Sequence, residues 1–279
     1  MRPRCGDVHA IRHAFSSYRG GGATVTPGRC YGAKRAGVFA QNVVFVTRLS
    51  VPAGGGDAWQ RCASTVTLES VIKHADLPLR YTTPAEWAAQ VLHEPLALLN
   101  DHAHLEKKAA TNALELLNRF PEPNPPENWV TAMTAVARDE VEHLAVVSRL
   151  LARRGGKLSR QHRNEYASRL RDLVRMGTGP GELVDRLMIS SLIEARSCER
   201  FKLLAAAVQD DKELAKLYRG LWASEHGHYL SFIQLAEQIQ PEKLVAKRWN
   251  EMLDAEAEII QKQSPGPRMH SGMGTGKKN

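Results

Sequence analysis

Apolar residues recur every three or four positions from Thr83 to Gln263, and nothing in this stretch alternates with the two-residue period of a strand. The pattern predicts an all-α domain in which each helix buries one apolar face. We expect four long and two shorter helices, at residues 83–120, 127–154, 159–176, 182–209, 213–239 and 242–263. Because short connections join antiparallel neighbours, the four long helices should form two helical hairpins, and these a four-helix bundle.

Local sequence signals mark where these helices begin and end. Thr83-Pro84-Ala85-Glu86 has the spacing of a capping box, in which Thr83 caps the helix and the Glu86 side chain accepts a hydrogen bond from the backbone N–H of Thr83. Residues 210–213 (Asp-Asp-Lys-Glu) predict a second capping box, and Pro95 predicts a kink inside the first helix. Pro121–Pro126, Gly155-Gly156 and residues 177–181 should each end the helix before them.

The two ends of the chain differ from the helical part in composition. Residues 1–56 contain two Gly-Gly-Gly triplets, eight Lys or Arg and one acid, without helical periodicity. This predicts a poorly ordered basic extension at 1–70, before a helical domain at 71–263 and a flexible tail at 264–279. The extension has two interpretations, a transit peptide for organellar import or translation from a start codon placed too far upstream.

Overall composition excludes several classes of protein. No apolar run approaches the ~18 residues needed to cross a bilayer, which argues against an integral membrane protein. The four cysteines form no Cys-x-x-Cys pair, which argues against a disulfide scaffold, a zinc ribbon or a built-in rubredoxin-type centre. A reducing, cytoplasmic location fits best, with organellar import as the alternative if residues 1–65 are a transit peptide.

Two Glu-x-x-His motifs, Glu140/His143 and Glu225/His228, carry the clearest chemical signal. Residues three apart lie on one helical face, and both motifs fall on stripes that are otherwise apolar. A single Glu-x-x-His motif most often lies on the solvent-exposed face of a helix. Charges on a core stripe must be paired or bound to a metal, and two Glu-x-x-His motifs plus one Glu from each partner helix is the ligand set of di-iron carboxylate bundles.

Helix rise indicates the two remaining glutamates. Glu106 lies about as far before the first hairpin turn as Glu140 lies after it. On the third long helix the candidates are Glu194, favoured by height and by its apolar stripe, and Glu199, favoured by a local likeness to the sequence around Glu106. Four carboxylates and two imidazoles suit iron or manganese. The competing interpretation is a bundle with buried Glu–Arg and Glu–His pairs.

Four segments of the sequence resemble the tRNA-(2-methylthio-isopentenyladenosine) hydroxylase family, MiaE. These segments are DHAHLEKKAATNAL (101–114), ARDEVEHL (137–144), LIEARSCERFKLLA (192–205) and SEHGHYL (224–230). The resemblance spans about residues 77–263 and leaves residues 1–70 without a counterpart. It implies a ferritin-like bundle and a non-haem di-iron monooxygenase, which uses O2 and two electrons to hydroxylate the isopentenyl side chain of a modified adenosine beside the anticodon.

The resemblance also implies the site and the partners. The metal ligands would be Glu106, Glu140, His143, Glu194 (or Glu199), Glu225 and His228. The partners would be tRNA and an external reductase or ferredoxin, with the protein a monomer or weak dimer. Competing hypotheses are a ferritin-like peroxidase, catalase or iron-handling protein, and a non-catalytic tRNA-binding helical protein.

A basic segment at residues 153–175 is the candidate RNA contact, because residues 57–263 as a whole carry a net charge near −2 and only a local patch can bind a polyanion. Within it we expect Arg154, Lys157, Arg160 and Arg163 to contact tRNA phosphates. The alternative is a solvated basic helix. Three histidines outside the motifs, His102, His104 and His226, are expected on helix surfaces or behind the ligands.

Overall fold

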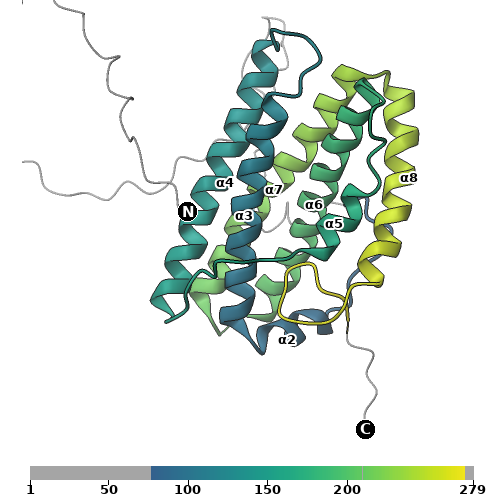
Figure 1. Cartoon of the computed structure of the whole chain (residues 1–279). Helices are drawn as coiled ribbons and strands as arrows, with labels where there is room; N and C mark the ends of the chain where they lie inside the picture. The colour runs from purple at the N-terminus through teal and green to yellow at the C-terminus, as the bar shows by residue number, and fades with distance from the viewer. Residues whose placement is uncertain (1–76, 209, 274–279) are drawn as a thin grey trace, which may run out of the picture. The chain divides into compact units, whose positions relative to one another are not determined.

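The computed structural model describes residues 77–208 and 210–273, and these fold into helices without strands (Figure 1). The helices are α2 (Glu86–Leu92), α3 (Pro95–Leu117), α4 (Glu127–Arg153), α5 (Glu165–Arg171), α6 (Pro180–Ala207), α7 (Lys212–Ile239) and α8 (Glu242–Gln261). The prediction of an all-α four-helix bundle is confirmed. No helix in this part of the chain is both long enough and apolar enough to cross a membrane.

Two antiparallel hairpins make up the bundle, as the sequence predicted. Helix α3 packs along α4, α6 packs along α7, and the hairpins meet where α4 contacts α7 (Figure 1). Helix α8 packs against α6, and the short α5 lies over α6 and α8. Helix α2 turns beneath the start of α3 and contacts α6.

The apolar core is divided into two clusters, one at each end of the bundle. The first joins the end of α3 and the start of α4 to the start of α6 and the end of α7, around Trp129 and Met188. The second joins the other ends of the same helices, around Phe201 and Trp222. Between the clusters each long helix carries buried polar side chains at mid-length. The fold therefore surrounds a polar centre with apolar layers.

Two of the local predictions at helix starts were wrong in detail. Thr83 does not cap a helix, because its backbone N–H and its hydroxyl both donate to Glu199, and α2 begins only after Ala85. The second capping residue is Asp211, which accepts from the backbone N–H of Leu214, so the cap lies one residue later than expected. The expected kink before α3 is a full break between α2 and α3.

The connections depart further from the predictions. Residues 159–176 were expected to be one basic helix, but only Glu165–Arg171 is helical. Residues 264–273 were expected to belong to a flexible tail, but Met269, His270 and Ser271 are buried. The backbone N–H of Met269 donates to Asp101 on α3, which holds this segment against the bundle. The predicted extension at 1–70 and the last six residues lie outside the described part of the chain.

Candidate metal centre

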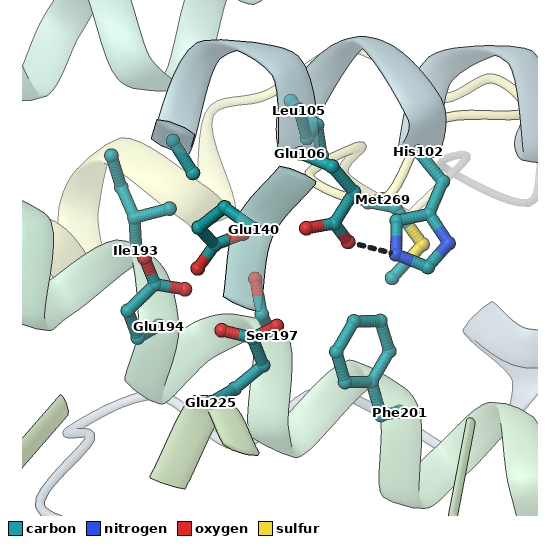
Figure 2. Close-up of a pocket in the computed structure, with 11 residues that line it drawn as sticks. His102, Leu105, Glu106, Glu140, Ile193, Glu194, Ser197, Phe201, Glu225 and Met269 are labelled. Atoms are coloured by element: carbon teal, nitrogen blue, oxygen red, sulfur yellow. Dashed lines mark ion pairs between the residues drawn. The ribbon is translucent and has the colours of Figure 1, made fainter. Parts of the chain in front are cut away.

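All six residues predicted as ligands by the motifs and by helix height come together at the centre of the bundle. Glu106 lies on α3, the Glu140/His143 motif on α4, Glu194 on α6 and the Glu225/His228 motif on α7. The four glutamates and His228 are buried, and the His143 side chain is 12% exposed. Figure 2 shows the four carboxylates pointing toward one another.

The two motif histidines lie between carboxylates. His143 Nδ1 is 3.0 Å from Glu225 Oε1 and 3.7 Å from both Glu106 Oε2 and Glu140 Oε2. His228 Nδ1 is 2.9 Å from Glu140 Oε1 and 3.1 Å from Glu225 Oε2. Glu140 and Glu225 thus each present one oxygen to each histidine, while Glu106 lies on the His143 side. Donor atoms of Glu106, Glu140, His143 and Glu225 lie within 4.8 Å of one another.

Burial and crowding keep two of the carboxyl groups protonated. Burial raises the pKa of Glu140 to about 8, and the charges of Glu225 and Glu106 add to the effect. Burial also raises the pKa of Glu194 well above its ordinary value, with Glu225 and Glu140 contributing next. Four buried carboxylates cannot all ionise at neutral pH without compensating positive charge.

The other two carboxyl groups are ionised because histidines face them. Burial opposes ionisation of Glu106, but the charge and hydrogen bond of His102 lower its pKa to about 2. Burial likewise opposes ionisation of Glu225, whose pKa is lowered by hydrogen bonds with His143 and His228. The carboxylates in turn raise the pKa of both motif histidines against the effect of burial. Protons therefore supply the positive charge that a metal would otherwise bring.

The donor set fits a metal centre better than a closed hydrogen-bond network. Both oxygens of Glu140, Oε1 of Glu225 and Nδ1 of His143 are buried without a well-directed hydrogen bond. Buried polar atoms normally form well-directed hydrogen bonds, and these atoms face mainly one another, so a metal ion would satisfy them better than their present ion-pair contacts do. Carboxylate oxygens and imidazole nitrogens in this proportion suit iron or manganese.

Glu194 and Glu199, the two alternatives on α6, have different surroundings. Glu194 faces the centre and lines the same cavity as Glu106, Glu140 and Glu225 (Figure 2). Glu199 points away, toward the chain before α2, where it accepts from Thr83 and pairs with Arg196. The structure therefore brings Glu194, and not Glu199, to the cluster.

His102 joins the site in a role that the sequence left open. Its Nε2 is 2.6 Å from Glu106 Oε1, one helical turn along α3, and its ring is buried beside Phe201. The position four residues before Glu106, on the same helical face, was the signal for it. Of the other histidines, His226 stacks on Trp222 and His104 stacks on His162, and both lie apart from the cluster.

An apolar-walled cavity of about 30 Å³ adjoins the carboxylates. Its walls include Leu105 and Ala109 of α3, Ile193 and Phe201 of α6, and Met269 of the C-terminal segment (Figure 2). This volume is enough for about one water-sized molecule. Leu105, Ala109 and Ile193 are partly exposed, so the cavity approaches the surface between α3 and α6.

The four predicted tRNA contacts are not equivalent in the structure. Arg154 pairs with Asp211 and Glu213 and is three-quarters covered. Lys157, Arg160 and Arg163 are exposed on the connection between α4 and α5.

Comparisons with known proteins identify the family of the chain. The family model described as tRNA-(MS[2]IO[6]A)-hydroxylase (MiaE) matches residues 70–271. A Pseudomonas putida protein named tRNA 2-(methylsulfanyl)-N(6)-isopentenyladenosine(37) hydroxylase is 38% identical over 204 residues, covering 73% of this chain and 97% of the relative. A Salmonella typhimurium protein of the same name is 28% identical over 242 residues, covering 70% of this chain and 88% of the relative.

A solved structure has a similar fold. The Synechococcus "Protein 43 with aldehyde deformylating oxygenase activity" superposes with a TM-score of 0.63 at 34% identity, covering 70% of this chain and 96% of that one. Since the family model spans more than half of the chain and the Pseudomonas relative is matched over nearly its whole length, the chain belongs to the tRNA-(MS[2]IO[6]A)-hydroxylase (MiaE) family.

Proposed function

We propose that this protein hydroxylates the isopentenyl side chain of 2-methylthio-isopentenyladenosine in tRNA, next to the anticodon, at a centre of two iron ions. The observation that carries the proposal is the interleaving of two Glu-x-x-His motifs, from α4 and α7, in one buried cluster with Glu106 and Glu194. Family membership supports the substrate, because the relatives described above are named as hydroxylases of this nucleoside in tRNA.

Six side chains would hold the metal pair. Glu140 and Glu225 each lie close to both motif histidines and would hold the metal pair together with them. Glu106 and Glu194 would complete the set from α3 and α6. Four carboxylates would balance the charge of two Fe(II) ions, and because ligands bind a metal in their deprotonated form, metal binding would release protons from the cluster.

When bound, the metal pair supplies the reduction of O2 and the oxidation of a C–H bond. In balance, the substrate C–H, O2, two electrons and two protons give the alcohol and water. The sequence has no Cys-x-x-Cys pair, so the electrons would come from a separate reductase or ferredoxin. We propose a cytoplasmic protein, acting as a monomer or weak dimer.

The chain itself must admit an apolar group and exclude water. Leu105, Ile193, Phe201 and Met269 offer apolar contacts suited to an isopentenyl group. The present cavity is too small for five carbon atoms, so these walls must separate when substrate binds. Closing them around the side chain would keep the reacting C–H bond in a water-poor site.

Iron content and product mass together test the proposal. Purified protein should bind about two irons per chain and should add one oxygen atom to the modified adenosine of tRNA, measured by mass spectrometry of digested nucleosides. Glu140→Ala and His228→Ala should each lose iron and product. Glu142→Ala is the matched control, because Glu142 lies on the same helix but is exposed. Full iron occupancy and turnover in either ligand variant would refute the di-iron assignment, and iron uptake without product would favour an iron-handling protein.

A further inference from the structure

A basic groove of about 390 Å³ lies between α3 and the connection from α4 to α5. Its cationic walls are Lys107 and Lys108 of α3 together with Arg160 and Arg163 of the connection. His104 and His162 also line it, with their rings stacked 4.8 Å apart at an interplanar angle of 1°. We call these six residues the basic groove.

Hydrogen bonds to α3 hold the connection in place, so the basic groove has a defined shape. The backbone N–H of Ser159 donates to Asn100 Oδ1 over 2.7 Å, and the Ser159 hydroxyl lies 2.9 Å from His104 Nε2. His162 is fixed from two sides, with Nε2 at 2.7 Å from Asp101 Oδ1 and Nδ1 at 2.9 Å from Lys108 Nζ. A preorganised site loses less entropy when it binds a ligand than a flexible one.

The positive charge of the basic groove is largely uncompensated. Lys107, Arg160 and Arg163 take part in no ion pair within residues 77–208 and 210–273. Burial lowers the pKa of Lys108, and the neighbouring cations Arg171 and Lys107 lower it further although Asp101 opposes them.

Elsewhere in the basic segment, three arginines already have acidic partners. Arg154 pairs with Asp211, and Arg175 pairs with the buried Asp185. These arginines are engaged within the fold, whereas Arg160 and Arg163 remain available to an external anion and lie together with the two lysines of α3.

The basic groove and the cavity beside the carboxylates share helix α3. His104 and Lys108 line the groove, while Leu105 and Ala109, the next residues along, line the cavity. Successive helical residues are rotated by about 100° and rise by about 1.5 Å, so the groove borders the side on which the cavity approaches the surface. An anion bound in the groove would therefore lie on the same part of α3 as a group inserted beside Leu105.

We propose that the basic groove binds phosphodiester groups of tRNA next to the nucleoside whose side chain enters the cavity. This inference rests on the proposed function, and it assigns RNA contacts to Lys107, Lys108, Arg160 and Arg163. Two of these lie on α3, outside the segment that the charge pattern of the sequence singled out. Lysine and arginine neutralise phosphates and release counterions, and such contacts position an RNA without reading its bases.

The test compares two triple variants with the same change in net charge. Lys107→Ala/Arg160→Ala/Arg163→Ala removes exposed groove cations that make no ion pair in the described chain, and Lys108 is retained because it holds His162. Lys216→Ala/Lys243→Ala/Lys247→Ala is the control on α7 and α8. The probe is a synthetic anticodon stem–loop carrying 2-methylthio-isopentenyladenosine, with binding followed by fluorescence anisotropy across KCl concentrations. Iron content and melting temperature check the fold of each variant.

The groove variant should bind the stem–loop about tenfold more weakly or worse at low salt, and the slope of log K against log[salt] should fall by roughly 2. The control should keep the slope and affinity of the parent. Parent-like binding by the groove variant, or equal losses in both variants, would overturn the inference and leave the proposed function standing. A parent protein that binds no stem–loop would overturn both.

Discussion

Exchanging Glu194 or Glu199 for glutamine should separate a metal ligand from a structural carboxylate on the same helix. Both side chains lie on α6, and Glu→Gln keeps size and shape while removing the negative charge. Glu194 lines the cavity beside Glu140 and Glu225, and Glu199 holds the chain before α2. The two variants should therefore fail in different assays.

Glu194→Gln should abolish or halve iron binding with little effect on the metal-free fold. Burial raises the pKa of Glu194 well above its ordinary value, which favours the neutral carboxyl group in the metal-free protein, and an amide is a close substitute for that form. The melting temperature of the metal-free protein should change by no more than a few degrees. Bound iron should fall from about two per chain to one or fewer, because an amide oxygen is a much weaker ligand than a carboxylate.

Glu199→Gln should keep iron and lose stability. Glu199 accepts hydrogen bonds from the Thr83 N–H at 2.8 Å and the Thr83 hydroxyl at 2.6 Å, and it also pairs with the buried Arg196. Hydrogen bonds to a charged group contribute about 1.5–3 kcal/mol each. An amide retains part of this, and Arg196 keeps Glu256, so the net cost should be about 2–3 kcal/mol. For a domain of this size that corresponds to a melting temperature lower by roughly 5–10 °C.

Colorimetric iron determination and differential scanning calorimetry on both variants give the two readouts. The reasoning fails if Glu199→Gln loses iron while Glu194→Gln retains about two per chain. It also fails if the metal-free Glu194→Gln protein is as destabilised as Glu199→Gln, since Glu194 would then be a structural group.

Two further predictions concern groups outside the ligand set. His102→Phe should weaken iron binding about 10- to 100-fold in chelator competition, because His102 contacts Glu106 and orients its carboxylate. The melting temperature of the metal-free protein should not fall, and an unchanged iron affinity would exclude this role. Asp185→Asn should cost about 3–5 kcal/mol in urea unfolding at pH 7, because Asp185 is buried between Arg175 and Arg248. Burial opposes ionisation of Asp185, but these arginines lower its pKa. The stability that the Asp185 carboxylate contributes is therefore present above the unfolded-state pKa of about 3.9 and is lost as pH falls through the folded-state pKa. The free energies of unfolding of the parent and the variant should converge at acidic pH, and a constant difference between them would contradict this.

The bundle and most of the site could be predicted because both depend on helical periodicity. A 3.6-residue repeat determines which face of a helix is buried, and a Glu and a His three residues apart must share that face. Equal rise along paired helices then brings Glu106 level with Glu140. Height and the apolar stripe favoured Glu194 over Glu199 but could not decide between them, because the local likeness to the sequence around Glu106 pointed to Glu199. The tertiary contacts of Glu199 with Thr83 and Arg196, away from the centre, could not be read from the sequence.

The connection from α4 to α5 and the C-terminal segment could not be predicted because tertiary contacts determine them. Residues rich in Arg and Lys are compatible with a helix, but Ser159 and His162 instead bond to side chains of α3. A tail rich in Gly and Pro has the composition of a flexible segment. It is nevertheless ordered, because Ser271 accepts a hydrogen bond from the buried Trp87 side chain and its carbonyl accepts one from Arg200.

Asp101 connects these two unpredicted segments through a single buried carboxylate. Its Oδ1 lies 2.7 Å from His162 Nε2 in the basic groove, and its Oδ2 accepts the backbone N–H of Met269, whose side chain lines the cavity, at 2.8 Å. The groove wall and one cavity wall are therefore positioned from the same point on α3, five residues before Glu106. The two oxygens of the Asp101 carboxylate are held at a fixed separation. If His162 shifts when the groove is occupied, Asp101 must therefore move with it or one of these two hydrogen bonds must break. The geometry of the surface groove and that of the apolar cavity beside the carboxylates are consequently set together.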